Sequence, residues 1–165
     1  MKKIFTLILT FISISSYSQY SSFEDAKVFK FLTISGQPSQ KTIDRVKKEK
    51  FDIILDLRNP GEFNDFNEKK YTEENGLSYH NIPFFDKENN ITKENISNIT
   101  NFIEKNKDKK IFVHCSSGNR ASSWLLIHLN KDHNMPLPKA IEITRNTGLT
   151  KDDLRTKVLQ FIKEP

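Results

Sequence analysis

The chain has 165 residues, of which 36% are hydrophobic, 28% charged and 11% aromatic. This length matches one ordinary domain, and the composition is too apolar for a disordered chain and too polar for a membrane-embedded bundle. The formal net charge is +5, but no stripe of basic residues with interleaved aromatics indicates a nucleic-acid partner. The single cysteine, Cys115, excludes an internal disulfide framework and a cage of several cysteines around a metal.

The first eighteen residues have the pattern of a secretory signal peptide. Lys2 and Lys3 precede a mostly apolar run over residues 4–14, and Ser16 and Ser18 then occupy the small-residue positions of a cleavage site. The run is shorter than the ~20 residues that a membrane span needs. We therefore predict cleavage after Ser18, an exported protein (periplasmic or secreted) with no stable membrane span, and one domain over residues 19–165. A retained N-terminal anchor or an ordinary buried helix is the alternative.

Beyond this segment, short apolar runs alternate with stretches of helical periodicity. Strands are predicted over residues 28–34, 51–57, 77–82 and 110–114. Helices are predicted over residues 39–50, 62–75, 119–133, 138–146 and 150–162, with a further helix beginning after Thr92. Ser39 and Thr92 are predicted N-caps, and Thr150 with Asp153 resembles a capping box. Such alternation predicts a single α/β domain with a central, mostly parallel sheet of four to five strands flanked by helices.

The most informative segment follows the last predicted strand. Cys115 stands at the end of that strand, and Arg120 opens the next helix. Ligand sites of α/β sheets lie at the carboxyl ends of strands, where a loop and a helix N-terminus can bind an anion through backbone N–H groups. We expect this loop to bind an oxyanion and to stabilise a thiolate, with Arg120 as a planar clamp. The predicted oxyanion-binding residues are Ser116, Ser117, Gly118, Asn119 and Arg120.

The pattern of a His-Cys pair, a short loop, an arginine and a helix resembles the cysteine-dependent phosphatases of the protein tyrosine and dual-specificity type. Two upstream stretches, 34–39 (Ile-Ser-Gly-Gln-Pro-Ser) and 53–58 (Ile-Ile-Leu-Asp-Leu-Arg), are similar to a bacterial branch of that group. This branch includes the phosphatase-like domain of beta-lactamase-hydrolase-like proteins. The resemblance covers roughly residues 29–133 and implies a phosphatase-like fold.

The resemblance also implies catalytic roles. Cys115 would attack phosphorus and form a phosphocysteine intermediate on a phosphate ester, while Arg120 and the loop amides hold the phosphoryl oxygens. Dual-specificity members carry their general acid on a loop some thirty residues before the cysteine, and Asp86 occupies that place here. A turn-forming aspartate is the alternative for Asp86. Ser122 is an auxiliary hydroxyl candidate, although Ala121 stands where these phosphatases have Ser or Thr.

The loop departs from the phosphatase pattern in its length. Four residues separate Cys115 from Arg120, whereas phosphatases of this type have five. Four is the spacing of rhodanese-type sulfurtransferases, and the smaller loop suits a persulfide or a compact sulfur oxyanion. A sulfurtransferase that uses a Cys115 persulfide is therefore the alternative enzyme. A non-catalytic oxyanion-binding module is the third possibility.

Other polar residues carry weaker signals. Arg58 follows a predicted strand end, so it either adds positive charge for the substrate or pairs with Asp56 or Glu62. His80, His128 and His133 show no metal-ligand spacing that includes carboxylates, and His128 lies on an apolar helix stripe as a core residue would. We therefore expect no metal and no cofactor. The expected partner is a small anionic or phosphorylated molecule, and the sequence does not indicate an oligomeric state.

Overall fold

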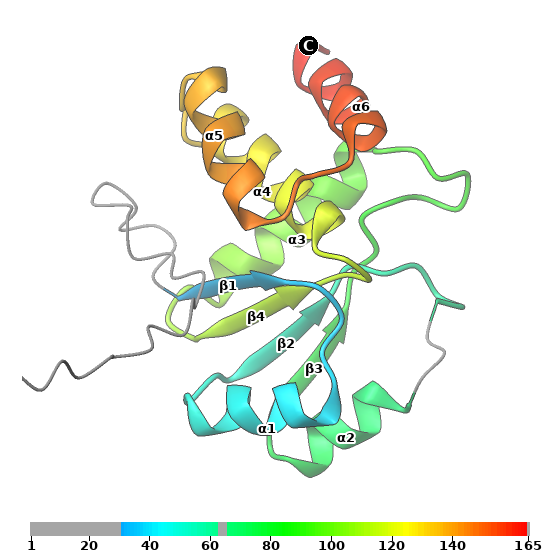
Figure 1. Cartoon of the computed structure of the whole chain (residues 1–165), viewed down its shortest axis with the longest axis vertical. Coiled ribbons are helices and arrows are strands. Elements are labelled where there is room, and N and C mark those ends of the chain that lie inside the picture. The colour runs from blue at the N-terminus through cyan, green and yellow to red at the C-terminus, as the bar shows by residue number, and fades with distance from the viewer. Residues whose placement is uncertain (1–30, 63–65, 165) are drawn as a thin grey trace, which may run out of the picture.

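The computed structural model describes residues 31–62 and 66–164, which form one α/β domain (Figure 1). The predicted signal peptide and residues 28–30 of the first predicted strand lie outside the described residues. The four strands are β1 (Leu32–Ser35), β2 (Ile53–Asp56), β3 (Ser78–Asn81) and β4 (Ile111–His114). The six helices are α1 (Gln40–Lys48), α2 (Glu68–Glu74), α3 (Lys93–Lys105), α4 (Asn119–Lys131), α5 (Leu137–Thr147) and α6 (Asp152–Lys163).

The sheet is parallel throughout, with the strand order β1-β4-β2-β3. The two central strands, β2 and β4, are buried along their whole length. Such strands read as continuous apolar runs, and this explains why the sequence locates them so clearly. The last residues of the four strands, Ser35, His114, Asp56 and Asn81, lie side by side in register. The carboxyl ends of all the strands therefore form one row.

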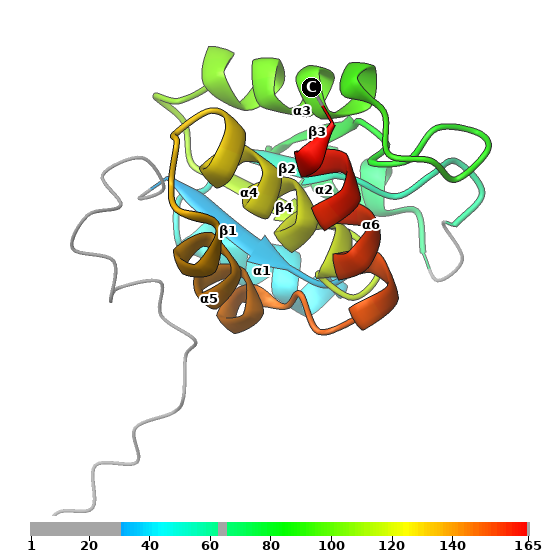
Figure 2. The same cartoon turned by 90° about the horizontal axis from the view of Figure 1, so that it is seen from above.

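Helices cover both faces of the sheet (Figures 1 and 2). On one face, Ile43 and Val46 of α1 pack with Ile54 and Phe112 of the central strands. On the other face, helices α3–α6 enclose the larger apolar core, where the fully buried Trp124 of α4 is the largest side chain. A parallel sheet needs both faces covered, and the alternation of strands and helices supplies that cover.

Several predicted helix ends are confirmed. The side chain of Ser39 accepts a hydrogen bond from the backbone N–H of Thr42, and the side chain of Thr92 accepts one from Asn95 N–H. Gly148 ends α5 with a positive φ, which favours glycine. No helix within the described ranges 31–62 and 66–164 has the length and apolarity to span a bilayer.

The structure corrects two predicted helix starts. Helix α2 begins at Glu68 rather than at residue 62, because Asn67 is its N-cap and Glu62 is bound elsewhere. Helix α6 has no capping box at Thr150. The two residues before the helix are bound instead, since the side-chain oxygen of Asn119 accepts hydrogen bonds from the backbone N–H groups of Thr150 and Lys151.

Candidate active site

The segment Cys115–Arg120 connects the end of β4 to α4, at the row of strand ends. Cys115 is only 1% exposed, so its thiol lies at the bottom of the loop. Ser116 and Ser117, by contrast, are exposed at the loop surface. A reactant would therefore reach the sulfur from the side on which these residues face solvent.

Gly118 turns the loop back toward the thiol. Its φ of +86° lies in the left-handed region that favours glycine. In this conformation its backbone N–H donates a hydrogen bond to Sγ of Cys115 at 3.2 Å. Backbone N–H groups that converge in this way form an anion-binding nest, here built around the sulfur. The Gly118 N–H is therefore one donor of the kind that the predicted nest requires.

Two glycines allow the turn after β1 to pack against the cysteine loop. A Cβ on Gly36 would lie 3.3 Å from the carbonyl oxygen of Ser116, and a Cβ on Gly118 would lie 3.4 Å from the carbonyl carbon of Ser35. The backbone N–H of Gln37 donates to the same Ser116 oxygen at 3.1 Å. The Ser-Gly-Gln-Pro motif thus supports the loop through its backbone.

Arg120 lies over the loop and is held by Glu62. Its Nη1 and Nη2 donate to the two carboxylate oxygens of Glu62, each at 2.6 Å, and Nη2 also donates to Oγ of Ser116 at 2.8 Å. The Ser116 hydroxyl in turn donates to Glu62 at 3.1 Å. The ring of Phe85 lies 5.9 Å from the guanidinium carbon. These contacts fix the orientation of the Arg120 side chain, which is 11% exposed.

The charges in this group stabilise one another. Hydrogen bonds from Arg120 lower the pKa of Glu62 to about 2 against the opposing effect of burial. Burial alone would lower the pKa of Arg120, but Glu62 and the nearby Cys115 side chain together raise it above its ordinary value. Arg120 is therefore close to the sulfur and is charged at any pH at which the protein would work.

We expect the stability contributed by Glu62 to depend on acidity. The folded-state pKa of Glu62, about 2, lies below the reference value of 4.5, so its contribution is complete above about pH 4.5 and is lost as pH falls toward 2. At neutral pH the variant Glu62→Gln should lower the free energy of unfolding by no more than about 1 kcal/mol, because Glu62 is 35% exposed and solvent screens the pair. Urea unfolding of both proteins at several pH values should show this difference shrinking below pH 4.5. A difference that stays constant over that window would contradict the assignment.

Asn119 has a positioning role that the sequence analysis missed. We expected an oxyanion-binding residue, yet its side-chain oxygen binds Thr150 N–H and Lys151 N–H, and its Nδ2 donates toward Oγ of Ser117 at 3.3 Å. This side chain therefore connects the cysteine loop to the start of α6. Because the Asn119 side chain is engaged in these bonds, the backbone N–H is the group of Asn119 that remains for oxyanion binding.

The carboxylate of Asp86 organises its own turn. Oδ1 accepts hydrogen bonds from the backbone N–H groups of Glu88 at 3.0 Å and Asn90 at 2.7 Å. The preceding residue, Phe85, contacts Arg120, so this turn borders the candidate site. The contacts fit the turn-forming alternative. Oδ2 accepts a longer hydrogen bond from Nδ2 of Asn90, at 3.4 Å, and is the oxygen that could carry a proton.

The hydroxyl of Ser122 is engaged with the end of α5. Ser122 is fully buried, its hydroxyl donates to the carbonyl oxygen of Thr147 at 2.9 Å, and it accepts from the Thr147 hydroxyl at 3.0 Å. These bonds connect α4 to the end of α5. Such contacts favour a structural role over an auxiliary catalytic one.

Arg58 does not line the site; it is the cation of a buried charge cluster beneath it. The guanidinium, 1% exposed, pairs with Asp56 at 2.7 Å and with Glu68. His114 Nε2 lies 2.8 Å from Glu68 Oε1, although the two are poorly aligned for a hydrogen bond. The Tyr79 hydroxyl donates to Asp56 at 2.7 Å. Of the alternatives predicted for Arg58, the pairing with Asp56 is confirmed, but its second partner is Glu68 rather than Glu62.

Burial and charge act against each other in this cluster. Burial opposes the charge on Arg58, but the hydrogen bond and charge of Asp56, together with Glu68, raise the pKa of Arg58 above its ordinary value. Burial, with the neighbouring Asp56 carboxylate, raises the pKa of Tyr79. His114 connects this cluster to the loop through its peptide bond to Cys115. The cluster thus holds the end of β4 from below.

Two groups of side chains within the described residues have the donor types and spacing of metal ligands. One is Asp56, Glu68 and His114, and the other is Glu104, His128 and His133. In the first group Arg58 already provides the cation between the carboxylates, so the group is a charge cluster rather than a metal site. The second group includes no arginine or lysine.

Sequence reasoning missed Glu62 and Glu68 as functional neighbours of the loop. Glu62 follows the turn Asn59-Pro60-Gly61 at the end of β2, the strand next to β4. A carboxylate at that strand end lies on the same edge of the sheet as Arg120. The order of the strands therefore indicates that Glu62 and Arg120 are neighbours. The sequence pattern did not identify Glu68, because a glutamate in the first turn of a helix gives the same pattern whether it is buried or exposed to solvent.

The fold and the site together define an α/β protein with a buried cysteine in the loop at the carboxyl end of a parallel strand, next to an arginine. The sequence matches the rhodanese-like domain over residues 39–141. The chain belongs to the rhodanese-like domain family. No match was found among curated proteins.

Solved structures share the fold. A protein of Shewanella putrefaciens CN-32 named "Putative phosphatase (DUF442)" is 21% identical, with a TM-score of 0.64 over 82% of this chain and 85% of that one. Tk-PTP in its active form is 21% identical, with a TM-score of 0.65 over 82% and 93% of the two chains. P. aeruginosa TpbA, solved as a cysteine-to-serine variant with pTyr, is 9% identical, with a TM-score of 0.64 over 80% and 78%. The predicted phosphatase-like α/β fold is thereby confirmed.

Proposed function

We propose that the chain is a cysteine-dependent hydrolase that acts on a phosphate ester through a phosphocysteine intermediate. The observation that carries the proposal is the geometry at Cys115, whose Sγ accepts the Gly118 N–H at 3.2 Å beneath the charged Arg120. The fold adds support, because the likeness to phosphatase structures covers 82% of the chain and so extends beyond the rhodanese-like segment 39–141.

In the first step the Cys115 thiolate attacks phosphorus, so that an S–P bond forms and the bond from phosphorus to the ester oxygen breaks. The leaving oxygen takes a proton and departs as an alcohol. Arg120 and the loop N–H groups stabilise the charge on the other three oxygens. In the second step water attacks phosphorus, the S–P bond breaks, and inorganic phosphate and the thiolate are released.

Glu62 determines how Arg120 meets the substrate. One N–H of each terminal nitrogen already binds Glu62, and Nη2 also binds Ser116. Five N–H groups are present on a guanidinium, so Nε and one N–H of Nη1 remain to bind the oxyanion. Glu62 thus holds the guanidinium plane in place before substrate arrives, which reduces the reorganisation needed in the reaction.

Asp86 is the proposed proton donor to the leaving oxygen, acting through Oδ2. The variant Asp86→Asn keeps an oxygen that can accept the N–H groups of Glu88 and Asn90, so the turn should remain intact. Loss of a general acid costs about 10²–10⁴-fold in rate, and the cost is greatest for a poor leaving group. We expect this loss in kcat on an alkyl phosphate and a much smaller loss on nitrophenyl phosphate.

The matched control for this test is Glu88→Gln, an exposed carboxylate in the same turn. It should leave kcat on both esters unchanged. If Asp86→Asn hydrolysed the alkyl phosphate as fast as the wild type, Asp86 would have no part in the mechanism and would be a turn-forming residue alone.

A rhodanese-type sulfurtransferase is the second candidate. The loop of four residues between Cys115 and Arg120 and the family match over residues 39–141 favour it. In this reaction Cys115 takes the outer sulfur of thiosulfate as a persulfide and releases sulfite, and cyanide then removes that sulfur as thiocyanate. No general acid is needed, which agrees with an Asp86 carboxylate engaged in its own turn.

One preparation should be assayed for both reactions. The proposal expects release of phosphate from an aryl phosphate, inhibited by vanadate, and no thiocyanate from thiosulfate and cyanide. Thiocyanate without phosphate release would overturn it in favour of the sulfurtransferase. Binding of inorganic phosphate that is weakened in Arg120→Ala, with turnover in neither assay, would instead identify a non-catalytic binding module.

We further propose that the protein works outside the cytoplasm after cleavage behind Ser18, on a small anionic or phosphorylated molecule. The complex of TpbA with pTyr supports a phosphorylated ligand for this fold. The basic start and apolar run of residues 1–18 support export. N-terminal sequencing of the protein recovered from its native cells tests this, since a chain that still begins at Met1 would contradict it.

A further inference from the structure

A cluster of two histidines and two carboxylates lies at the far end of α4. His128 stands nine residues into the helix, about 13 Å along its axis from the Asn119 start at the cysteine loop. Its Nε2 lies 3.1 Å from Nε2 of His133 and 3.9 Å from Oε1 of Glu104, which comes from α3. The Asp132 carboxylate lies on the other side of the ring, 2.6 Å from Nδ1 of His128.

The surroundings fix both the orientation and the tautomer of His128. Its ring stacks on Trp124 at 4.9 Å with an interplanar angle of 16°, and it is almost fully buried. Because a carboxylate only accepts hydrogen bonds, Nδ1 of His128 carries the proton that Asp132 receives. Burial also lowers the pKa of His128, so its neutral form is favoured. Nε2 therefore presents a lone pair toward His133 and Glu104.

We propose that His128, His133 and Glu104 bind one divalent ion of the zinc class. A zinc ion lies about 2.0–2.1 Å from each nitrogen, so tetrahedral ligand atoms are about 3.3 Å apart. The observed separations of 3.1 and 3.9 Å match that spacing within a small side-chain adjustment. In the metal-free protein the His133 N–H can hydrogen-bond to the His128 lone pair, and the ion would take the place of that proton.

The donor set determines which ions fit. Two imidazole nitrogens and one carboxylate oxygen suit zinc and its neighbours in the transition series, whereas magnesium and calcium require oxygen ligands. Asp132 would act on the ion through His128, as carboxylates behind ligating histidines do. Three protein ligands leave one coordination position for water.

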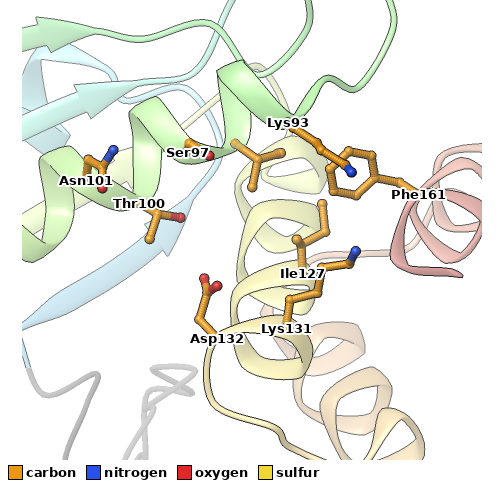
Figure 3. Close-up of a pocket in the computed structure, with 9 residues that line it drawn as sticks. Lys93, Ser97, Thr100, Asn101, Ile127, Lys131, Asp132 and Phe161 are labelled. Atoms are coloured by element: carbon orange, nitrogen blue, oxygen red, sulfur yellow. The ribbon is translucent and has the colours of Figure 1, made fainter. Parts of the chain in front are cut away.

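The local charges permit a cation. Lys131 is the nearest lysine on α4 in sequence, but its ammonium group donates to the carbonyl oxygen of Glu164 at 2.8 Å and lies over the ring of Phe161. Figure 3 shows the groove between α3 and α4, where Asp132 at the end of α4 points toward α3 and Thr100. The Thr100 hydroxyl accepts a hydrogen bond from Trp124 at 3.1 Å, which further fixes the ring on which His128 stacks.

The site would be structural rather than catalytic. The metal would connect the end of α4 to α3, at the opposite end of α4 from Cys115. Because only the folded chain brings these three side chains together, bound metal should stabilise the fold by an amount that rises with the logarithm of its free concentration above Kd. The proposal is independent of the reaction at Cys115.

The test is zinc binding to the tag-free chain in a Cys115→Ser background, where neither a histidine tag nor the thiol can bind the ion. Isothermal titration with ZnCl2 should give one ion per chain. His133→Ala and Glu104→Gln should each weaken binding more than about tenfold, a loss at least as great as that from altering an outer-shell partner. Cobalt in place of zinc should give the visible absorption of four-coordinate Co²⁺, and zinc should raise the Tm of this background.

The matched control is His80→Ala, because His80 is an exposed histidine on β3. It should bind zinc like its parent. Both His133→Ala and Glu104→Gln replace exposed side chains, so folding should be preserved, which circular dichroism checks. The absence of stoichiometric binding, or equal affinity in His133→Ala and His80→Ala, would overturn the proposal.

Discussion

Replacing Cys115 by serine should abolish turnover of an aryl phosphate. A serine hydroxyl is a far weaker nucleophile than a thiolate. Removing the nucleophile of an enzyme of this kind lowers kcat by about 10⁴-fold or more. The fold should tolerate the change, since a serine oxygen can accept the Gly118 N–H that now binds Sγ. Steady-state kinetics with purified variant and wild type measure the loss.

Oxyanion binding provides the control for this variant. Arg120 and the loop N–H groups remain in Cys115→Ser, so inorganic phosphate should bind to it about as tightly as to the wild type. Loss of both binding and turnover would indicate a damaged loop, which unfolding curves would reveal. Retained turnover within tenfold of the wild type would contradict the assignment of Cys115 as the nucleophile.

The second large effect is expected from Arg58→Ala and concerns stability. Removing this guanidinium leaves Asp56 and Glu68 buried without the cation that pairs with both. Breaking a buried ion pair by deleting one partner costs about 3–5 kcal/mol, because an uncompensated buried charge remains. Urea unfolding followed by circular dichroism should show that loss in the free energy of unfolding.

Arg45→Ala is the matched control for Arg58→Ala. Arg45 pairs with Glu49 at 3.7 Å on α1, but its side chain is 53% exposed. An exposed pair of this type contributes less than about 1 kcal/mol, so this variant should unfold almost like the wild type. Equal effects of the two variants would contradict the account of the cluster beneath the loop.

The fold was largely predictable because its signals are local. The central strands are short apolar runs, and the caps at Ser39 and Thr92 use side chains three residues from the amides that they bind. The predicted start of α6 failed for the opposite reason. The amides of the two residues before it are bound by Asn119 from another part of the chain, and no local pattern records such a contact.

The same distinction holds for the site. Cys115, Gly118 and Arg120 are adjacent in sequence, so the loop was recognised before its geometry was known. Long-range partners such as Glu62 on Arg120 depend on the strand order, which the sequence alone did not establish. The carboxylate near His128 was missed for the same reason, because Glu104 reaches it from a different helix.

The covalent state of Cys115 during turnover tests the central claim most directly. The protein is mixed with an aryl phosphate, quenched in acid and digested, and the peptide that contains Cys115 is weighed by mass spectrometry. The account predicts a peptide heavier by one phosphoryl group, and no such gain in Cys115→Ser. Turnover with an unmodified Cys115 peptide, or a gain of one sulfur atom from thiosulfate with no phosphoryl gain from the ester, would contradict the phosphatase mechanism.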